Sequence, residues 1–357
     1  MEILSTLKVI LESRTYSIHN FQSFGYQKLY QSIAEFLEDS SPSFQLKCPY
    51  LNDWVLINDE DTLNTYIKHS VSPLVYVVYP DAPCVIRIET YNLAIFGMHA
   101  NWDQRVHMIA QQIKQISPDI LGLQEAKYDP FYGLSKSERA LVEENEKIRF
   151  ERHMMNDLMA LLPEYPYSYW CDSMHYGDGS IEGISIVSRF PIIDIKATKL
   201  SSANDDGNQR SCVRGTINHP KKRIFFYNTH VTYGTNGQNT QAAEILQFMD
   251  SEKDRQIPQI LVGDMNLYQH YQSPAHIFEG KLNASSPPTK LKDAWSIVRG
   301  NEEGFTHPSW NPQDRLDRIY YRNLEDPFIC EISGYAESPT VWPSDHCTLY
   351  ADFIISI

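Results

Sequence analysis

The sequence predicts an α+β protein in which a small mixed roll precedes two packed mixed sheets flanked by helices. After residue 85, short apolar runs recur at hairpin spacing, with only a few long helical stripes between them. Before residue 80, strand and helix patterns follow one another in the order ββαββαβ. The proline-flanked segment 79–83 separates the two patterns, so we expect one domain at residues 1–80 and another at 85–357.

The elements of the first domain follow from apolar spacing. In residues 26–37, Leu29, Ile33 and Phe36 recur at helical spacing, as in a helix that packs on a sheet. The other expected elements are strands at 4–10, 15–18, 44–47, 54–57 and 74–78 and a short helix at 61–68.

Residues 52–63 resemble the acidic signature of Phox/Bem-type (PB-one) interaction domains. The resemblance implies a ubiquitin-like β-grasp roll whose acids pair with a lysine on the first strand of a partner domain. The acids of that face would be Asp53, Asp59, Glu60 and Asp61, and Lys8 would supply the basic face. Two other interpretations stay open. Residues 59–61 could merely begin the second helix, because acids in a first turn suit the helix dipole, and the roll could be a degenerate ubiquitin-like cap.

Residues 85–357 read as alternating strands and helices. After a strand at 85–92, Asp103 is placed to cap a helix that Pro118 ends. Residues 135–162 then read as a long, charged helical region. Further strands are expected at 121–125, 184–187, 211–217, 224–230, 259–264, 315–321 and 348–355.

Polar side chains stand where three of these apolar runs meet loops. Glu125 ends the run 121–125, and Asp264 and Asn266 emerge from the run 260–262. Asp345 and His346 directly precede the last strand. Carboxylate and amide oxygens suit a hard divalent cation, so these strand ends predict metal-assisted chemistry on an anionic substrate.

Seven short motifs follow one another in a fixed order through the second domain. They are Tyr91-Asn92, Leu123-Gln124-Glu125, the run 182–191, Asn228-Thr229-His230, Gly263-Asp264-Met265-Asn266, the run 315–319 and Ser344-Asp345-His346. In this order they resemble the motifs of the deoxyribonuclease I-like endonuclease/exonuclease/phosphatase superfamily, over essentially all of residues 85–357. The resemblance implies a four-layer αββα sandwich and Mg²⁺-dependent cleavage of a phosphoester by water, with Mn²⁺ as a substitute.

The resemblance also implies roles for individual residues. Glu125 would be the main metal ligand, with Asn92 and Asp345 shaping the water shell of the metal. Mg²⁺ is commonly held by one or two carboxylates and several waters, so this sparse set is reasonable. Asp264 would orient and deprotonate the attacking water, and Asn266 would donate to a non-bridging phosphate oxygen.

Two histidines and an arginine complete the implied site. His346, oriented by Asp317, would donate a charge-assisted hydrogen bond to the phosphate. His230, near Glu182, would hold the scissile phosphate or protonate the leaving oxygen, because a paired carboxylate raises the pKa of a histidine. Arg210 occupies the position of a phosphate-contacting arginine in some members of the superfamily.

Plainer interpretations compete for several of these residues. Asp317 could pair with Arg315 or Arg318, and Glu182 could lie at a turn. A surface salt bridge would explain Arg210 as well. The strand-end acids could act only as loop caps.

The net charge of −14 argues against broad electrostatic affinity for nucleic acid. Ala94 and His230 depart from the abasic-site endonucleases, whereas residues 90–92 and 342–346 and the added N-terminal module are similar to the Mg²⁺-dependent tyrosyl-DNA phosphodiesterases. We therefore expect a phosphodiesterase acting on nucleic acid or nucleotides. A sphingomyelinase-like or inositol-lipid phosphohydrolase and an interaction scaffold remain as alternatives.

The sequence also carries expectations about location. No apolar stretch approaches the roughly 18–20 residues of a membrane span, and the first residues lack the pattern of a secretory signal. The six cysteines are scattered without metal-type spacing, which favours reduced thiols. We expect a cytoplasmic or nuclear protein with a possible protein partner at its N-terminal domain.

Overall fold

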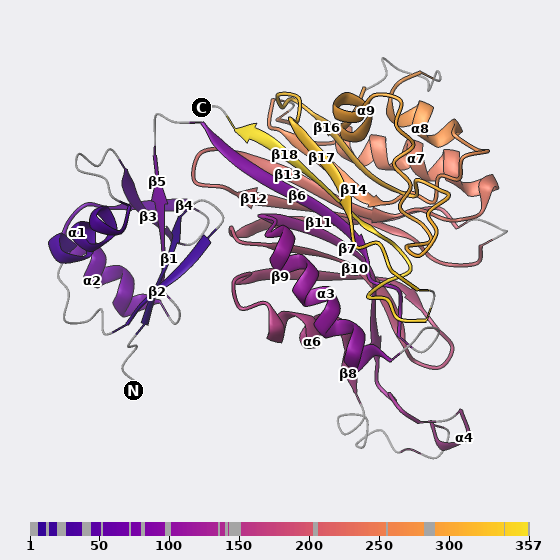
Figure 1. Cartoon of the computed structure of the whole chain (residues 1–357), viewed down its shortest axis with the longest axis horizontal. Helices are drawn as coiled ribbons and strands as arrows, with labels where there is room; N and C mark the ends of the chain where they lie inside the picture. Colours follow the sequence, from indigo (N-terminus) through magenta and orange to yellow (C-terminus); the bar gives the residue numbers. More distant parts are fainter. Residues whose placement is uncertain are drawn as a thin grey trace. The chain divides into compact units, whose positions relative to one another are not determined.

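Strands dominate both parts of the chain in the computed structural model (Figure 1). The structure describes residues 6–11, 14–19, 26–37, 44–50, 53–70, 73–79, 83–96, 101–134, 136–139, 142, 151–202, 206–254, 256–281, 290–338 and 340–355. Two units separate between Val85 and Ile86. The first comprises Met1–Val85 with Asn218–Arg223 and Ile354–Ile357, and the second comprises Ile86–Ile217 and Ile224–Phe353.

The first unit has the element order ββαββαβ that the sequence predicts. Its elements are β1 (Thr6–Leu11), β2 (Arg14–His19), α1 (Tyr26–Phe36), β3 (Gln45–Tyr50), β4 (Asp53–Ile57), α2 (Glu60–His69) and β5 (Leu74–Val78). They form a five-stranded sheet in the order β2-β1-β5-β3-β4, in which β1 and β5 run parallel. Leu29 and Ile33 of α1 and Leu63 of α2 share one core with the sheet residues Val9 and Val75. Residues 4–5, 52 and 80–82 of the sequence predictions lie outside the described residues.

The acids predicted to bind a partner lie at the start of α2 and on β4. Asp59 is the N-cap of α2, and its Oδ1 accepts a hydrogen bond of 2.8 Å from the Thr62 backbone N–H. Glu60 and Asp61 occupy the first helical turn. The helix-start interpretation therefore holds for these three acids, although all of them and Asp53 are also exposed.

The second unit is built on two sheets. A seven-stranded sheet runs in the order β17-β18-β6-β7-β10-β9, with β8 paired to β7, and a six-stranded sheet runs β11-β12-β13-β14-β16-β15. The strands of the first sheet are β6 (Cys84–Asn92), β7 (Ile120–Asp129), β8 (Arg152–His153), β9 (Tyr167–His175), β10 (Ile181–Ser188), β17 (Ile329–Ser333) and β18 (Thr348–Ile355). Those of the second are β11 (Ile192–Lys199), β12 (Ser211–Asn218), β13 (Arg223–His230), β14 (Gln259–Asp264), β15 (Lys292–Asp293) and β16 (Asp317–Arg322).

Helices cover both sheets of this unit (Figure 1). The helices are α3 (Trp102–Ile116), α4 (Lys136–Arg139), α6 (Met154–Leu161), α7 (Thr235–Asp250), α8 (Ser273–Phe278) and α9 (Ala294–Arg299). Ile109 of α3 and Leu158 of α6 are fully buried in one core with β7 residues such as Leu123. Ile245 of α7 and Phe278 of α8 are buried in another core, with β13 and β14. This arrangement of helices and sheets is consistent with the predicted αββα sandwich.

Three local predictions were wrong. Asn101, not Asp103, caps α3, because its side-chain oxygen accepts from the Asp103 backbone N–H. The region 135–162 is not one helix, since Arg152–His153 pairs with β7 as strand β8 before α6 begins at Met154. The strands β9, β11, β15 and β17 were missed. The partly exposed residues of β9, β11 and β17 lack the apolar runs used to find the other strands, and β15 has only two residues.

The two sheets meet at a position where only glycine fits. A Cβ atom on Gly122 of β7 would lie 2.3 Å from Cγ2 of Val262 on β14. Beside this close approach, Gln124 Nε2 donates to Asn228 Oδ1 across the sheets at 2.7 Å. The Asn228 amide nitrogen in turn donates to the carbonyls of Leu123 and Ser185 at 2.9 and 2.8 Å. The spacing and register of the two sheets are thus set by steric fit and by directional hydrogen bonds.

Two observations bear on the expected location. Among the described residues no helix combines the length and apolarity that crossing a membrane requires. Five of the cysteines, Cys48, Cys171, Cys212, Cys330 and Cys347, are buried as thiols.

Glu89 of β6 makes the stability of the fold depend on pH. Its side chain is fully buried, and Oε1 accepts from the Thr348 hydroxyl at 2.6 Å. Burial raises the pKa of Glu89 from 4.5 to about 8. A carboxyl that is easier to protonate in the folded state contributes stability below its unfolded pKa, and this stability is lost as pH rises through the folded pKa.

We therefore expect Glu89→Gln, which keeps the acceptor for Thr348, to become more stable relative to the wild type as pH rises from 4.5 to about 8. A fully developed difference of one proton changes the free energy of unfolding by about 1.4 kcal/mol per pH unit. Urea unfolding of both proteins across this range measures the difference. A gap that does not change with pH would contradict a buried, titrating Glu89.

Candidate active site

Strand register brings three predicted catalytic residues side by side. His230 at the end of β13 pairs with Asp264 at the end of the parallel strand β14. Asp264 pairs in turn with Asp317 at the start of the antiparallel strand β16. The direction of the strands therefore places His230, Asp264 and Asp317 at the same edge of the six-stranded sheet, although Asp317 lies 87 positions after His230 in the sequence.

A glycine lets these strand ends approach closely. Gly263 has φ +153°, and a Cβ atom there would lie 2.1 Å from the backbone oxygen of Thr229. The next residue is Asp264, and Asn266 follows in a left-handed conformation with φ +49°. This turn directs the Asn266 backbone N–H back to Asp264 Oδ1 at 2.8 Å.

The seven-stranded sheet contributes an amide and a carboxylate. Asn92 ends β6 and pairs with Gln124 of β7, which brings it beside Glu125. Glu125 has φ +57°, and its two carboxylate oxygens accept from Asn92 Nδ2 at 3.1 Å and from the Ile95 backbone N–H at 3.0 Å. Each oxygen keeps a further lone pair, and the side chain is only half-buried.

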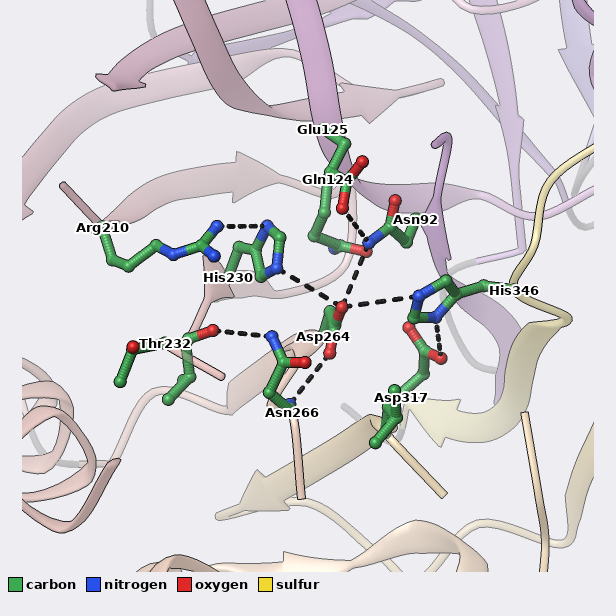
Figure 2. A network of polar contacts seen from close by, with 12 residues as sticks. Asn92, Gln124, Glu125, Arg210, His230, Thr232, Asp264, Asn266, Asp317 and His346 are labelled. Atoms are coloured by element: carbon green, nitrogen blue, oxygen red, sulfur yellow. Dashed lines mark hydrogen bonds and ion pairs between the residues drawn. The ribbon is translucent and has the colours of Figure 1, made fainter. Parts of the chain in front are cut away.

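Asp264 is the centre of the network (Figure 2). Its Oδ2 lies 3.0 Å from Asn92 Nδ2, 3.4 Å from His230 Nε2 and 3.7 Å from His346 Nε2. Asn92 Nδ2 thus bridges Asp264 and Glu125, one carboxylate from each sheet. Burial raises the pKa of Asp264 to about 6, which suits a group that accepts a proton near neutral pH.

His346 is held by two carboxylates. Its Nδ1 lies 2.8 Å from Asp317 Oδ2, and its Nε2 faces Asp264. Burial alone would lower the pKa of His346, but Asp317 and Asp264 outweigh it and raise that pKa well above its usual range. The imidazole is therefore an imidazolium at neutral pH, with an N–H directed toward each acid. Asp317 contacts His346, as the resemblance to the superfamily implied. The alternative partners of Asp317, Arg315 and Arg318, both bind Asp293.

His230 has different surroundings from those expected. Its Nδ1 lies 3.0 Å from Arg210 Nη1, while the nearest oxygen of Glu182 is 3.7 Å away. Burial and the Arg210 guanidinium lower the pKa of His230 well below its usual range. The expectation that Glu182 raises the pKa of His230 was therefore wrong, because burial and the Arg210 cation, which lies closer than the acid, together outweigh it. Burial and the Glu125 carboxylate also raise the pKa of Glu182 to about 7.

Arg105 was missed by sequence reasoning. It is buried, its Nη2 donates to the carbonyls of Leu93 and Ala94, and its Nε donates to that of Pro343 at 2.8 Å. It therefore ties the loop that follows Asn92 to the loop that carries Asp345. Burial lowers the pKa of Arg105, and the acids Asp345 and Glu125 are near enough to oppose that shift. Its spacing of four from Ile109 on the buried face of α3 was the available sequence signal.

Two sets of acids could in principle hold a cation. Asp264, Asp317 and His346 form a cluster whose ligand atoms lie within 4.8 Å of one another among the described residues. Within this cluster His346 Nδ1 lies 2.8 Å from Asp317 Oδ2, and its Nε2 lies 3.7 Å from Asp264 Oδ2. Glu125 offers carboxylate oxygens with further lone pairs on a half-buried side chain, and such hard oxygen ligands fit Mg²⁺ or Mn²⁺.

The sequence model of the Endonuclease/Exonuclease/phosphatase family matches residues 90–346. The chain belongs to this family, whose members are phosphoester hydrolases, and the prediction of such an enzyme is confirmed. The family match begins after the first unit and says nothing about it. No curated protein matches the chain.

Solved structures share the fold at low sequence identity. TDP2 from D. rerio complexed with single strand DNA product aligns with a TM-score of 0.54 at 15% identity, over 76% of this chain and 99% of that one. The human Nocturnin catalytic domain with bound sulfate anion gives 0.51 at 18%, over 76% and 94%. A mannosyl-6-phosphatase from Bacteroides thetaiotaomicron gives 0.51 at 18%, over 76% and 100%. These likenesses establish the fold of the second unit.

Proposed function

We propose that the chain is a divalent-metal-dependent phosphodiesterase that hydrolyses nucleic acid or nucleotides by direct attack of water. The observation that carries the proposal is the buried Asp264 carboxylate, which two histidines and Asn92 surround, with Glu125 next to Asn92. A base, phosphate-facing donors and a hard-cation site within one network are the parts that phosphoester hydrolysis needs.

Glu125 would hold the metal, with Asn92 and Asp345 shaping its surroundings. When bound there, Mg²⁺ or Mn²⁺ would polarise a phosphoryl oxygen as a Lewis acid. Asn92 would act mainly through its hydrogen bond to Glu125, because its amide nitrogen points to the carboxylate and its oxygen accepts from the Ala94 backbone N–H.

Asp264 would accept the proton of the attacking water. Its Oδ2 faces Asn92 and the two histidines, whereas Oδ1 accepts from the Asn266 backbone N–H and from no other donor of the described residues. The remaining lone pair of Oδ1 is therefore the better site for water. Asn266 Nδ2 gives one hydrogen to the Val231 carbonyl at 2.8 Å. The second hydrogen of that amide would bind a non-bridging phosphate oxygen.

His346 would stabilise the negative charge that grows on the phosphate in the transition state. Its imidazolium N–H at Nε2, which lies 3.7 Å from Asp264 Oδ2, would donate to the phosphate, while Asp317 keeps the ring oriented and charged. A donor aligned before the reaction stabilises the transition state more than the ground state.

Aromatic side chains near Asp264 favour a nucleotide over a lipid substrate. Tyr233 is 45% exposed and follows His230 by three residues. Burial raises the pKa of Tyr268, and the Asp264 carboxylate is close enough to add to this shift. Tyr268 also stacks on the exposed ring of His270, with ring centroids 5.8 Å apart. Such faces stack well on bases and would supply affinity that an acidic chain lacks.

The decisive experiment offers one panel of substrates with Mg²⁺. The panel contains single- and double-stranded DNA, RNA, tyrosyl-linked DNA, sphingomyelin and phosphoinositides. Preferred hydrolysis of a nucleic acid supports the proposal, and preferred hydrolysis of a lipid replaces it with the phosphohydrolase alternative. Binding without any hydrolysis would favour the scaffold alternative.

We expect Glu125→Gln to lower metal-dependent turnover by roughly two orders of magnitude, because one lost charge removes several kcal/mol of transition-state stabilisation. Glu244→Gln is the matched control, since Glu244 also accepts from a backbone N–H, that of Ser201, outside the site. Turnover with increasing Mg²⁺ measures the effect. Full activity of Glu125→Gln in a chelator would refute the metal assignment.

We expect Asp317→Asn to lower kcat at least about tenfold with little change in KM, because His346 loses the carboxylate that keeps it charged and oriented. Asp326→Asn is the control, since Asp326 pairs with Lys292 away from the site. Steady-state kinetics on one good substrate separate the two parameters. A rise in KM alone would assign Asp317 to substrate binding.

We further infer that residues 1–80 form a ubiquitin-like interaction domain of the Phox/Bem type. The element order supports this, and so do the four exposed acids, of which Asp61 also lines a cavity of 410 Å³ with Tyr50 and Val55. Asp59 caps α2 by accepting from the Thr62 backbone N–H, and Glu60 accepts from the Asn64 side chain within the same helix. The acidic face would bind a basic partner surface.

Removal of residues 1–83 should leave a folded, active hydrolase on a small soluble substrate, because each unit has its own buried core. In the full chain, replacement of Asp53 and Asp61 by Lys should abolish partner binding without changing hydrolysis. Circular dichroism, turnover and binding at low and high salt test both statements. A truncated chain that folds but is inactive would show that residues 1–83 help to complete the active site.

A further inference from the structure

We propose that Arg210 fixes His230 as the neutral tautomer protonated on Nε2, so that His230 can donate a hydrogen bond but cannot protonate the leaving group. Arg210 is then a positioning residue that acts through His230 and does not touch the substrate. The role of His230 in the reaction rests on the proposed function, whereas the tautomer is a property of the resting protein.

The contact between the two side chains determines where the proton lies. Arg210 Nη1 is 3.0 Å from His230 Nδ1 (Figure 2). A guanidinium has only donors, so Nδ1 must supply the lone pair and the ring proton must sit on Nε2. That N–H faces Asp264 Oδ2 at 3.4 Å. A second proton, on Nδ1, would place two N–H groups against each other.

Arg210 cannot readily turn away from His230. Its Nε and Nη2 both lie 3.3 Å from Asp206 Oδ2, whose side chain is fully buried. The Thr232 hydroxyl donates to the same oxygen at 2.5 Å. On the other edge of the guanidinium, Arg210 Nη1 also lies 3.5 Å from Glu182 Oε1. A guanidinium held on both edges keeps its plane, which explains why Arg210 serves His230 rather than a substrate phosphate.

The charged groups around His230 act in opposite directions. Glu182 at 3.7 Å and Asp264 at 3.4 Å favour an imidazolium, whereas Arg210 and the nearby His346 oppose it. Arg210 is the closest of them and approaches along the Nδ1 lone pair. Burial is the largest cause and Arg210 adds to it, and together they lower the pKa of His230 well below its usual range.

His346 provides the internal comparison. Both histidines direct Nε2 at the same oxygen of Asp264, at 3.4 and 3.7 Å. Nδ1 of His346 contacts the carboxylate of Asp317, whereas Nδ1 of His230 contacts the guanidinium of Arg210. The group in contact with each Nδ1 therefore makes one histidine a cation and the other a neutral donor.

The assignment also constrains the reaction. The water oxygen forms the new bond to phosphorus, and Asp264 takes one proton from that water. The leaving oxygen departs with the electron pair of the broken P–O bond and takes its proton from solvent rather than from His230. His230 contributes a hydrogen bond from Nε2, which requires no proton transfer.

Nitrogen NMR of the full chain with labelled histidine tests the tautomer directly and needs no substrate. The His230 resonances, identified by their loss in His230→Gln, should show a bare Nδ1 and a protonated Nε2 that do not change between about pH 5 and pH 8, although an unperturbed histidine titrates near pH 6.5. In Arg210→Met, His230 should begin to titrate, because Glu182 becomes its nearest charged neighbour at Nδ1. A proton on Nδ1 at neutral pH in the unaltered protein overturns the proposal.

Kinetics provide the second measurement. His230→Gln should lower kcat by the same factor on nitrophenyl and alkyl phosphodiesters, and a larger loss on the alkyl ester would restore the proton-donor role and refute ours. Arg210→Met should lower kcat and add a pH-dependent limb that is lost in the double variant with His230→Gln. Arg322→Met is the control. Arg322 donates to Asp250 and Gln259, each at 2.8 Å, and lies outside the site. This variant should leave the pH profile unchanged. If no phosphodiester is hydrolysed, the proposed function fails while the NMR measurement still decides the tautomer.

Discussion

One buried carboxylate organises the site, and the strand register explains why it lies there. Asp264 pairs with His230 on one side and with Asp317 on the other. Gly263 permits the close approach that this register needs, since any Cβ atom would collide with the neighbouring strand. A fully buried acid is costly unless donors surround it. Donors from Asn92, Asn266 and the two histidines surround Asp264, and three of these residues, Asn266 and the histidines, are also those that we propose to face a phosphate.

Asp264 illustrates how a protein makes two chemically identical side chains behave differently. His230 and His346 approach the same oxygen from opposite sides (Figure 2). Their charge states are set one contact further out, by Arg210 and by Asp317. Because both rings are buried, water screens these neighbours little and their influence is large. A single imidazolium beside Asp264 also limits the positive charge that the buried site must carry.

The sequence predicted the polar ends of the strands better than the contacts between their side chains. Asp264, Asn266 and Glu125 were found because apolar runs end at them, and this signal is local. The partner of Arg210 could not be found in this way, since His230 lies 20 residues further along and Glu182 was an equally plausible partner for the histidine. The prediction for the cap of α3 was wrong for a related reason, because Asn101 competes with Asp103 for that position. Strand β8 was missed because its two residues are too few to show periodicity. Pairings that depend on which of several nearby groups approaches most closely require the three-dimensional structure.

The division of the site between two sheets makes its geometry depend on their packing. Asn92 and Glu125 belong to one sheet, and Asp264 and His230 to the other. The Asn92 side chain joins the two halves through hydrogen bonds of 3.1 and 3.0 Å. Such bonds tolerate only a few tenths of an ångström of movement. Gly122 and the buried amides of Gln124 and Asn228 fix the spacing of the sheets close to these residues. Buried amides that satisfy one another specify a single register, whereas an apolar contact alone would allow the sheets to slide. The polar layer between the sheets therefore holds Asp264, the proposed base, and Glu125, the proposed metal-site acid, at a fixed separation, and would support the proposed reaction without contact with the substrate.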